Sequence, residues 1–290
     1  KILFENTCWE IRTNQHWAVI GKNGSGKSII VNALCRDVPV VSGQIYYFFN
    51  KDGDFNNPRP FFVKNEIVKL TPEVHGKLMR EQSGYHQARW NSIEGKNSLT
   101  VSDFLDSSHD SEEKTEVIGL LGIQYLLKRK IFHLSDGESR KVLIAQALMQ
   151  SPKLLILDDP FCGLDNRSRD GLKNALDSLL EKDSVQIILV TQRQEEIPRG
   201  ITHVLCVDKN RTICQGPREK IFESSFAREV FSANKDNIVD NISQVKVDLQ
   251  NSLEKNSILV EMKNTSVSYG GINVLQDINW TMREGQNWAI

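Results

Sequence analysis

Short apolar runs recur along the chain, separated by polar loops or by longer stretches with helical spacing. Runs of this length that are rich in β-branched residues predict strands. Strands that alternate with helices form a mostly parallel α/β sheet, and the last two runs are close enough together to form an edge hairpin. The predicted strands are Ile2–Ile11, His16–Ile20, Gly43–Phe49, Glu66–Leu70, Leu154–Leu157, Val185–Val190, Val204–Asp208 and Thr212–Gln215.

Helical patterns fill most of the segments between these strands. The clearest helix start precedes an apolar-periodic run that ends at Leu148. Ser135 suits the N-cap position there, and Glu138 lies three residues further on, where it completes a capping box. The other helices are predicted over 28–34, within the polar stretch 72–129, and after residues 163–165 to about residue 181.

A glycine-rich stretch between the strand His16–Ile20 and the following helix predicts a phosphate-binding loop. Glycines let backbone N–H groups approach phosphates, and the N-terminus of the helix favours an anion. In the pattern GxxxxGK[ST], Lys27 reaches the β- and γ-phosphates and the Ser28 hydroxyl binds magnesium. A surface turn gives no reason for this Lys-Ser pair. The predicted nucleotide-binding residues are Gly21, Lys22, Asn23, Gly24, Ser25, Gly26, Lys27 and Ser28.

Two carboxylates follow the apolar strand Leu154–Leu157. An apolar strand that delivers an aspartate at its C-terminal end is how P-loop proteins hold magnesium. Asp158 is therefore predicted to bind the metal together with Ser28, and the predicted ligands are a nucleotide and Mg²⁺, the nucleotide being ATP if the resemblance described below holds.

Composition narrows the function class only a little. Charged residues make up 25% of the chain and the net charge is -1, so net charge does not indicate a nucleic-acid partner. The five cysteines are scattered without a CxxC pair, which is typical of buried free thiols in a reducing compartment. No apolar run approaches the roughly 20 residues that cross a bilayer. We expect a cytoplasmic location or another reducing compartment such as the mitochondrial matrix, although the chain begins at Lys1 and its true N-terminus can be missing.

The order of these motifs resembles the ATP-binding cassette (ABC) ATPases. After the phosphate loop comes Leu134–Glu138 (LSDGE), which looks like the family's signature segment, and then LLILDD, GLD and TQ. The resemblance covers residues 1–232 and implies an α/β fold of the P-loop NTPase class. It comprises a mostly parallel core sheet, an antiparallel β subdomain and a helical insert at about 73–135. Residues 134–167 are most similar to the ModF-type soluble proteins, which carry two cassettes in tandem.

The C-terminal stretch repeats the N-terminal one. Residues 275–290 match residues 4–19, each 271 positions further along the chain, so that Trp280 corresponds to Trp9. A repeat of this kind changes the domain assignment. Residues 1–232 are predicted to be a first ABC domain, 233–257 a polar linker, and 258–290 the N-terminal strands of a second, truncated ABC domain. Tyr269 stands where the family places an aromatic that stacks on adenine; in the first domain this place lies before Lys1.

The family also implies how two cassettes share their sites. They close head to tail around two ATP molecules, and each site combines the phosphate loop of one cassette with the signature segment of the other. Ser135 and Gly137 are therefore expected to bind ATP held by a partner cassette. That partner is the second ABC domain of the same chain or another copy.

The resemblance implies catalytic roles for Lys27, Asp159 and Gln192. Asp159 stands where the family usually has Glu and is one methylene shorter, and Gln192 stands where it usually has His and cannot carry charge. Asp136 replaces a glycine of the signature segment. Because positioning dominates phosphoryl-transfer catalysis, we expect this site to bind ATP better than it hydrolyses it.

Two points stay open at the level of sequence. The glutamine that the family places after the strand Glu66–Leu70 has no clear counterpart; Glu73 lies nearest, and Gln82 and Gln87 are rivals. The favoured function is a soluble tandem ATPase whose closure binds or releases a partner. The alternatives are the ATP-binding subunit of a transporter with separate membrane subunits, for example of the molybdate type, and a ribosome- or nucleic-acid-associated tandem cassette.

Overall fold

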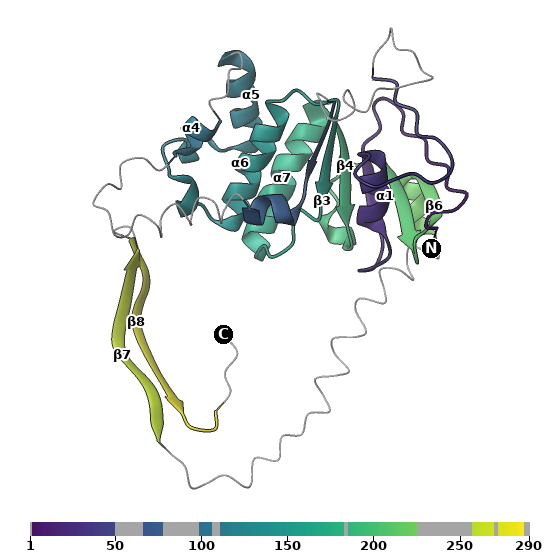
Figure 1. Cartoon of the computed structure of the whole chain (residues 1–290). Helices are drawn as coiled ribbons and strands as arrows, with labels where there is room; N and C mark the ends of the chain where they lie inside the picture. Colours follow the sequence, from purple (N-terminus) through teal and green to yellow (C-terminus); the bar gives the residue numbers. More distant parts are fainter. Residues whose placement is uncertain are drawn as a thin grey trace. The chain divides into compact units, whose positions relative to one another are not determined.

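The computed structural model divides the chain into two compact units, Lys1–Asn234 (unit 1) and Lys235–Ile290 (unit 2). Figure 1 shows both units, with colours that follow the sequence. The structure describes residues 2–49, 66–77, 99–105, 111–182, 185–224, 257–269 and 272–286. Within these residues, no helix is both long and apolar enough to span a membrane.

Unit 1 is built on a six-stranded sheet in the order β2-β3-β4-β1-β5-β6. All neighbouring strands pair in parallel except β5 and β6, which form the antiparallel hairpin expected at the sheet edge. The mostly parallel core sheet predicted from the sequence is thus confirmed. The strands are β1 (Trp17–Ile20), β2 (Ile67–Leu70), β3 (Leu154–Asp158), β4 (Gln186–Thr191), β5 (His203–Asp208) and β6 (Arg211–Pro217).

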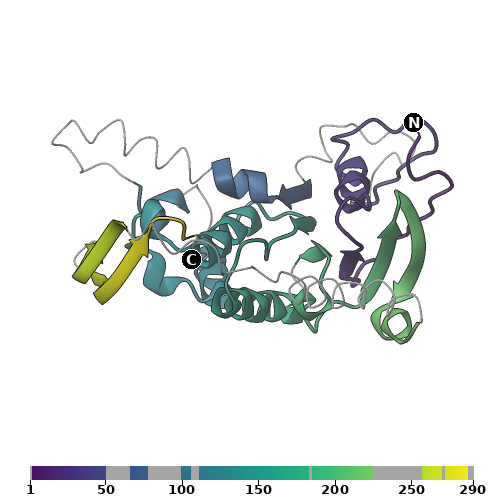
Figure 2. The same ribbon diagram turned by 90° about the horizontal axis from the view of Figure 1, so that it is seen from below.

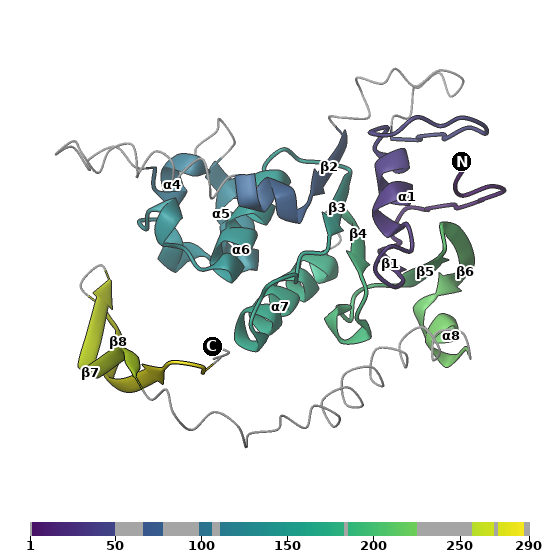
Figure 3. The same cartoon turned by 60° about the horizontal axis from the view of Figure 1, so that its bottom comes forward.

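Helices cover both faces of this sheet. Figure 3 shows α1 and α7 on opposite sides of β3 and β4, and in Figure 2 the teal helices of residues 101–148 lie at the other end of unit 1 from the green β5–β6 hairpin. The helices are α1 (Lys27–Leu34), α4 (Val101–Phe104), α5 (Ser111–Leu121), α6 (Asp136–Leu148), α7 (Asn166–Lys182) and α8 (Arg218–Glu223). The 3₁₀ turns are η1 (Gln124–Leu126), η2 (Ile131–His133) and η3 (Gln194–Glu196), and residues 72–77 are also helical.

Two hydrophobic clusters lie on the two faces of the sheet. In β3, Leu155 and Leu157 belong to the larger cluster with α5, α6 and α7, whereas Leu154 and Ile156 belong to the smaller cluster with α1. Successive side chains of a strand point to opposite faces, and a parallel sheet is covered on both. This is why these strands are apolar throughout.

Two predicted strands are not formed. Residues 2–11 and 43–49 carry no strand in the structure, and Phe4 and Asn6 adopt left-handed backbone angles (φ 57° and 55°). Their apolar pattern has another cause, because Trp9, Ile11, Tyr47 and Phe49 pack against the smaller cluster. A segment that packs on one side shows the same alternation of apolar and polar residues as a strand, but a strand also needs a neighbouring strand for its backbone hydrogen bonds. Among the described residues, the antiparallel pairs are instead β5–β6 and β7–β8.

The insert and the linker are described only in part. Within about 73–135, the structure contains the helical segment 72–77, α4, α5, η1 and η2, while residues 78–98 and 106–110 lie outside the described residues. The linker predicted at 233–257 also lies outside them, apart from its last residue.

Unit 2 contains an antiparallel hairpin of β7 (Ile258–Tyr269) and β8 (Ile272–Arg283). Several of its large apolar side chains are exposed: Ile258, Leu259, Val260, Val267 and Leu275. An isolated two-stranded hairpin is marginally stable in water. Residues 287–290, which complete the sequence repeat, lie outside the described part.

Candidate nucleotide-binding site

The C-terminal ends of three neighbouring strands meet at one edge of the sheet. Ile20 at the end of β1 is in register with Thr191 of β4, and Asp158 of β3 is in register with Val190. The phosphate loop Gly21–Ser28 starts directly after β1, and Asp159 follows β3. Ligands of open α/β sheets bind at such carboxyl ends, so the topology brings these predicted site residues to one place.

The backbone of the phosphate loop has room only for glycine at two positions. A Cβ on Gly21 would lie 2.2 Å from the Val207 carbonyl oxygen, and one on Gly26 would lie 2.6 Å from Asn210 Oδ1. Gly26 also has φ 104°, which L side chains rarely adopt. The Asn210 N–H donates a 2.7 Å hydrogen bond to the Ser25 carbonyl. The turn between β5 and β6 therefore holds the loop in place through a contact between distant segments that was not predicted.

Two side chains of the loop are arranged to receive an oxygen-rich ligand. The Lys27 ammonium donates to the carbonyl oxygens of Gly21 (2.9 Å) and Lys22 (3.0 Å), which folds its side chain back over the loop. Burial lowers the pKa of Lys27, and the charges of Asp159 and Asp158 oppose this. The buried Ser25 hydroxyl has no hydrogen-bond partner in the described part of the chain. A buried polar group of this kind is costly unless a ligand satisfies it.

The residues predicted to bind magnesium lie together. The Ser28 hydroxyl hydrogen-bonds to the Asp158 carboxylate, which is 9% exposed. Burial raises the pKa of Asp158, and the Ser28 hydrogen bond and the Lys27 charge oppose that rise. No group of three or more His, Cys, Asp or Glu side chains in the described residues could hold a metal. Magnesium at a phosphate site needs only one or two carboxylates because phosphate oxygens and water complete its shell, so Ser28 and Asp158 fit this ion.

The two predicted catalytic residues beside Lys27 follow adjacent strands. Asp159 is half-buried with a left-handed backbone (φ 49°), and its N–H donates to the Val190 carbonyl at 2.9 Å. Gln192 is half-buried and follows the fully buried Thr191 of β4. Strained backbone at a strand end is common at active sites, and here it sets the direction of a carboxylate near the phosphate loop.

The signature segment confirms the predicted capping box. The Glu138 N–H donates to Ser135 Oγ (3.2 Å), and the Ser135 N–H donates to Glu138 Oε2 (2.9 Å). Ser135 is exposed, but Gly137 is buried, and a Cβ there would lie 2.8 Å from the Ser168 side chain of α7. Gly137 thus allows α6 to approach α7 closely. Its contact with a nucleotide, and that of Ser135, stays a prediction.

A histidine near the signature segment was missed at the level of sequence. His75 is buried, and its Nε2 lies 2.6 Å from Ser139 Oγ of α6. The Ser139 hydroxyl oxygen also lies 2.9 Å from the Asp136 carbonyl, to which it donates. Burial, followed by the charge of Arg140, lowers the pKa of His75, while Asp136 opposes the shift. Glu73, two residues earlier, is exposed, and Gln82 and Gln87 lie outside the described residues.

The cysteines differ from the expectation of buried thiols. All five are free; Cys35 and Cys206 are buried, Cys214 is half-buried, and Cys8 and Cys162 are exposed.

Comparison with known proteins agrees with this geometry. Residues 4–162 match the family model described as ABC transporter. An uncharacterized ABC transporter ATP-binding protein of Schizosaccharomyces pombe is 30% identical over 298 residues, which cover 99% of this chain and 57% of that protein. The ABC transporter ATP-binding protein ModF of Escherichia coli is 27% identical, over 97% of this chain and 54% of ModF. The chain therefore spans about half the length of these two curated relatives.

Solved structures share the fold. The cbiO1 protein of Clostridium perfringens, part of an ABC transporter complex, superposes with a TM-score of 0.59 at 21% identity, over 83% of this chain and 90% of that one. A nucleotide-free ATP-binding cassette from an ABC transporter gives a TM-score of 0.53 at 20% identity, over 76% and 88% of the two chains. Together with the family match, which covers more than half of the chain, these findings confirm the resemblance. The chain belongs to the ABC transporter family, and the matched residues form its ATP-binding ATPase domain.

Proposed function

We propose that unit 1 binds ATP with Mg²⁺ at the phosphate loop and hydrolyses it when paired head to tail with a second cassette. The main observation behind this proposal is that Lys27 and the hydrogen-bonded Ser28–Asp158 pair lie together at the C-terminal ends of β1 and β3. The partner cassette is the second ABC domain of the same chain or another copy.

The residues of the loop would act mainly by positioning. Lys27 would leave the carbonyl oxygens of Gly21 and Lys22 and donate to phosphate oxygens, while the uncapped N-terminus of α1 offers backbone N–H groups. Ser28 and Asp158 would hold Mg²⁺, which supplies charge neutralisation across the phosphates when bound. Asp159 would accept a hydrogen bond from the attacking water, and Gln192 would help to orient it.

Two residues, Asp159 and Gln192, support weak hydrolysis at this site. The Asp159 carboxylate stands on a short side chain, and its backbone is held by Val190, so it can reach the water only from a restricted direction. Gln192 can orient water but cannot carry positive charge. Asp136, in the first turn of α6, adds a negative charge beside Ser135, which in the head-to-tail arrangement would act on the ATP held by the partner cassette. We infer that ATP binds to this site more readily than it is turned over.

A tandem protein accounts for the domain organisation. We assign 1–232 to the first ABC domain, 233–257 to the linker and 258–290 to the first strands of a second ABC domain. The sequence repeat, the β7–β8 hairpin and the roughly twofold length of the relatives support this. The hairpin's exposed apolar side chains require cover from further residues. A soluble switch that binds or releases a partner, in a reducing compartment, follows as the cellular role.

A transport role is the second candidate. The zinc import ATP-binding protein ZnuC of Psychrobacter arcticus is 30% identical over 76% of this chain and 79% of ZnuC, and a molybdenum import ATP-binding protein also matches. In this second candidate function, a separate membrane subunit docks on unit 1, and ATP-driven closure of the two cassettes drives transport. Capture of a membrane subunit by the ATP-trapped full-length protein favours this candidate, and capture of a non-membrane partner favours the first.

Calorimetric titration of the 290-residue chain with ATP, with and without Mg²⁺, tests the site. Lys27→Ala removes the charged phosphate ligand and should weaken binding by about tenfold to a hundredfold, that is about 1.4–2.8 kcal/mol. Lys153→Ala serves as the control because Lys153 is an exposed lysine just before β3. Unchanged affinity in Lys27→Ala would refute the assignment.

A further inference from the structure

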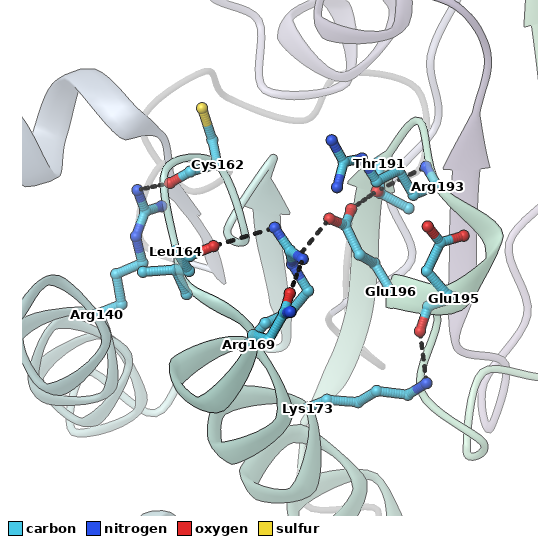
Figure 4. Close-up of polar contacts among 10 residues, drawn as sticks. Arg140, Cys162, Leu164, Arg169, Lys173, Thr191, Arg193, Glu195 and Glu196 are labelled. Atoms are coloured by element: carbon cyan, nitrogen blue, oxygen red, sulfur yellow. Dashed lines mark hydrogen bonds and ion pairs between the residues drawn. The ribbon is translucent and has the colours of Figure 1, made fainter. Parts of the chain in front are cut away.

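Two arginines from different helices hold the connecting loop, residues 160–165, which follows Asp159 and leads to α7. Figure 4 shows both contacts. Arg140 of α6 donates through Nη2 to the Cys162 carbonyl at 2.7 Å, and Arg169 of α7 donates through Nη2 to the Leu164 carbonyl at 3.1 Å. The backbone of the connecting loop is therefore tied both to the helix that starts at Ser135 and to the first turn of α7.

The same Arg169 guanidinium reaches a buried carboxylate in η3. Arg169 Nε lies 3.4 Å from Glu196 Oε1, and Glu196 is 3% exposed. The other carboxylate oxygen of Glu196 accepts a hydrogen bond from the Thr191 hydroxyl. The Thr191 hydroxyl oxygen in turn accepts from the Arg193 N–H at 3.2 Å. Because Thr191 and Arg193 flank Gln192, these contacts fix the segment that carries it.

The chemistry of this contact favours arginine over lysine. A buried carboxylate is stable only when it is paired and hydrogen-bonded. Burial raises the pKa of Glu196, while the Thr191 hydroxyl and the charges of Arg193 and Arg169 hold it down. The planar guanidinium donates a hydrogen bond to the Leu164 carbonyl through Nη2, while its Nε lies 3.4 Å from Glu196 Oε1 in an ion pair without a hydrogen bond. An ammonium is a single point of charge that cannot keep both contacts in the same geometry.

We propose that Arg169 is a positioning residue for ATP hydrolysis, which couples the connecting loop after Asp159 to the segment that carries Gln192. Arg140 extends this coupling to the helix that begins at Ser135, so that a change at the signature segment reaches Gln192 through the connecting loop. None of the contacts described for Arg169 involves the phosphate loop, so it acts on turnover and not on nucleotide affinity. This inference rests on the proposed function.

The test is steady-state ATP hydrolysis by the full-length protein with the other site disabled, together with calorimetric ATP affinity and thermal stability. Arg169→Lys keeps a positive charge near Glu196 and should lower kcat by about tenfold or more, since small misplacements are costly in positioned catalysis. KM and ATP affinity should stay within about twofold of wild type. Lys173→Met is the matched control: Lys173 lies one turn further along α7 and donates to the Glu195 carbonyl at 2.6 Å, so it contacts the same turn without reaching the carboxylate. It should keep wild-type kcat.

A double-mutant cycle distinguishes loss of the Arg169–Glu196 contact from a general loss of catalytic function. Glu196→Gln in the Arg169→Lys background should lower kcat no further than Arg169→Lys alone, because both changes break the same contact. Wild-type kcat in Arg169→Lys, or a loss of ATP affinity equal to the loss of kcat, would overturn the inference. Absence of ATP turnover in the wild-type protein would instead refute the proposed function.

Discussion

Two helix N-termini in unit 1 are built in opposite ways. At the start of α1, the N-cap is Gly26 with no side-chain cap, and the first turn carries no acidic residue. At the start of α6, Ser135 and Glu138 form a complete capping box, and Asp136 and Glu138 place two carboxylates in the first turn. An uncapped end leaves N–H groups for an external anion, whereas side-chain caps satisfy them and acidic residues offset the positive end of the helix.

This difference indicates different roles for the N-terminal ends of α1 and α6. The α1 end can hold a phosphate by itself, with Lys27 and the unpartnered Ser25 hydroxyl beside it. The α6 end presents one exposed serine next to its own carboxylates, so its affinity for a free anion is low. It suits a nucleotide that is already held by another cassette, and in the proposed head-to-tail pair ATP would shift the population toward the closed state.

The largest effect on ATP affinity is expected from a substitution that distorts the N-terminal end of α1. Gly26→Ala forces a side chain into a backbone with φ 104° and against Asn210, so the loop must change shape. ATP affinity of the chain should fall by about a hundredfold. Gly122→Ala is the control, because Gly122 also has positive φ (61°) but its Cβ would meet nothing within 4 Å. Calorimetry of both variants checks this, and equal affinities in the two would contradict it.

A smaller effect is expected at the catalytic carboxylate. Asp159→Glu adds the methylene that the family usually has, and it should raise turnover at this site by several-fold, up to about tenfold. The rate should be measured in the full-length protein with the other site disabled. Asp170→Glu, an exposed change of the same kind on α7, should leave the rate as it is. No gain, or a loss, in Asp159→Glu would show that Gln192 or another change sets the rate.

The smallest effect concerns the link between His75 and the signature helix. Since the folded protein holds the pKa of His75 below its usual value of about 6.5, the unfolded chain binds the proton more readily below that pH. Stability should therefore decline as pH falls from about 6.5 toward the folded-state pKa. The difference in Tm between wild type and His75→Asn, measured from pH 8 to 5, should shift by a few degrees over this window. A constant difference would show that His75 does not titrate in this range.

The sequence was sufficient for features that depend on local spacing. The strand and helix that flank the glycine-rich loop, the capping box at Ser135 and the strand that ends at Asp158 each form as predicted, because their signals lie within a few neighbouring residues. Contacts between distant segments were not predictable from one sequence. Arg169 of α7 and Glu196 of η3 form an ion pair, and Asn210 holds the phosphate loop from the β5–β6 turn. Residues 43–49, which were wrongly predicted to be a strand, show that alternating apolar and polar residues indicate packing on one side of a segment and do not indicate backbone hydrogen bonding to a neighbouring strand.

The most direct test of the account uses Ser135→Arg, which fills the outer face of the signature segment. Ser135→Thr is the matched control, since it keeps the capping hydroxyl. ATP affinity is measured for the 290-residue chain, and ATP turnover for the full-length protein. The account predicts that Ser135→Arg leaves the affinity of the chain within about twofold and lowers full-length turnover by about a hundredfold or more. A large loss of affinity in the chain itself would show that the signature segment serves its own phosphate loop, and the head-to-tail assignment would be wrong.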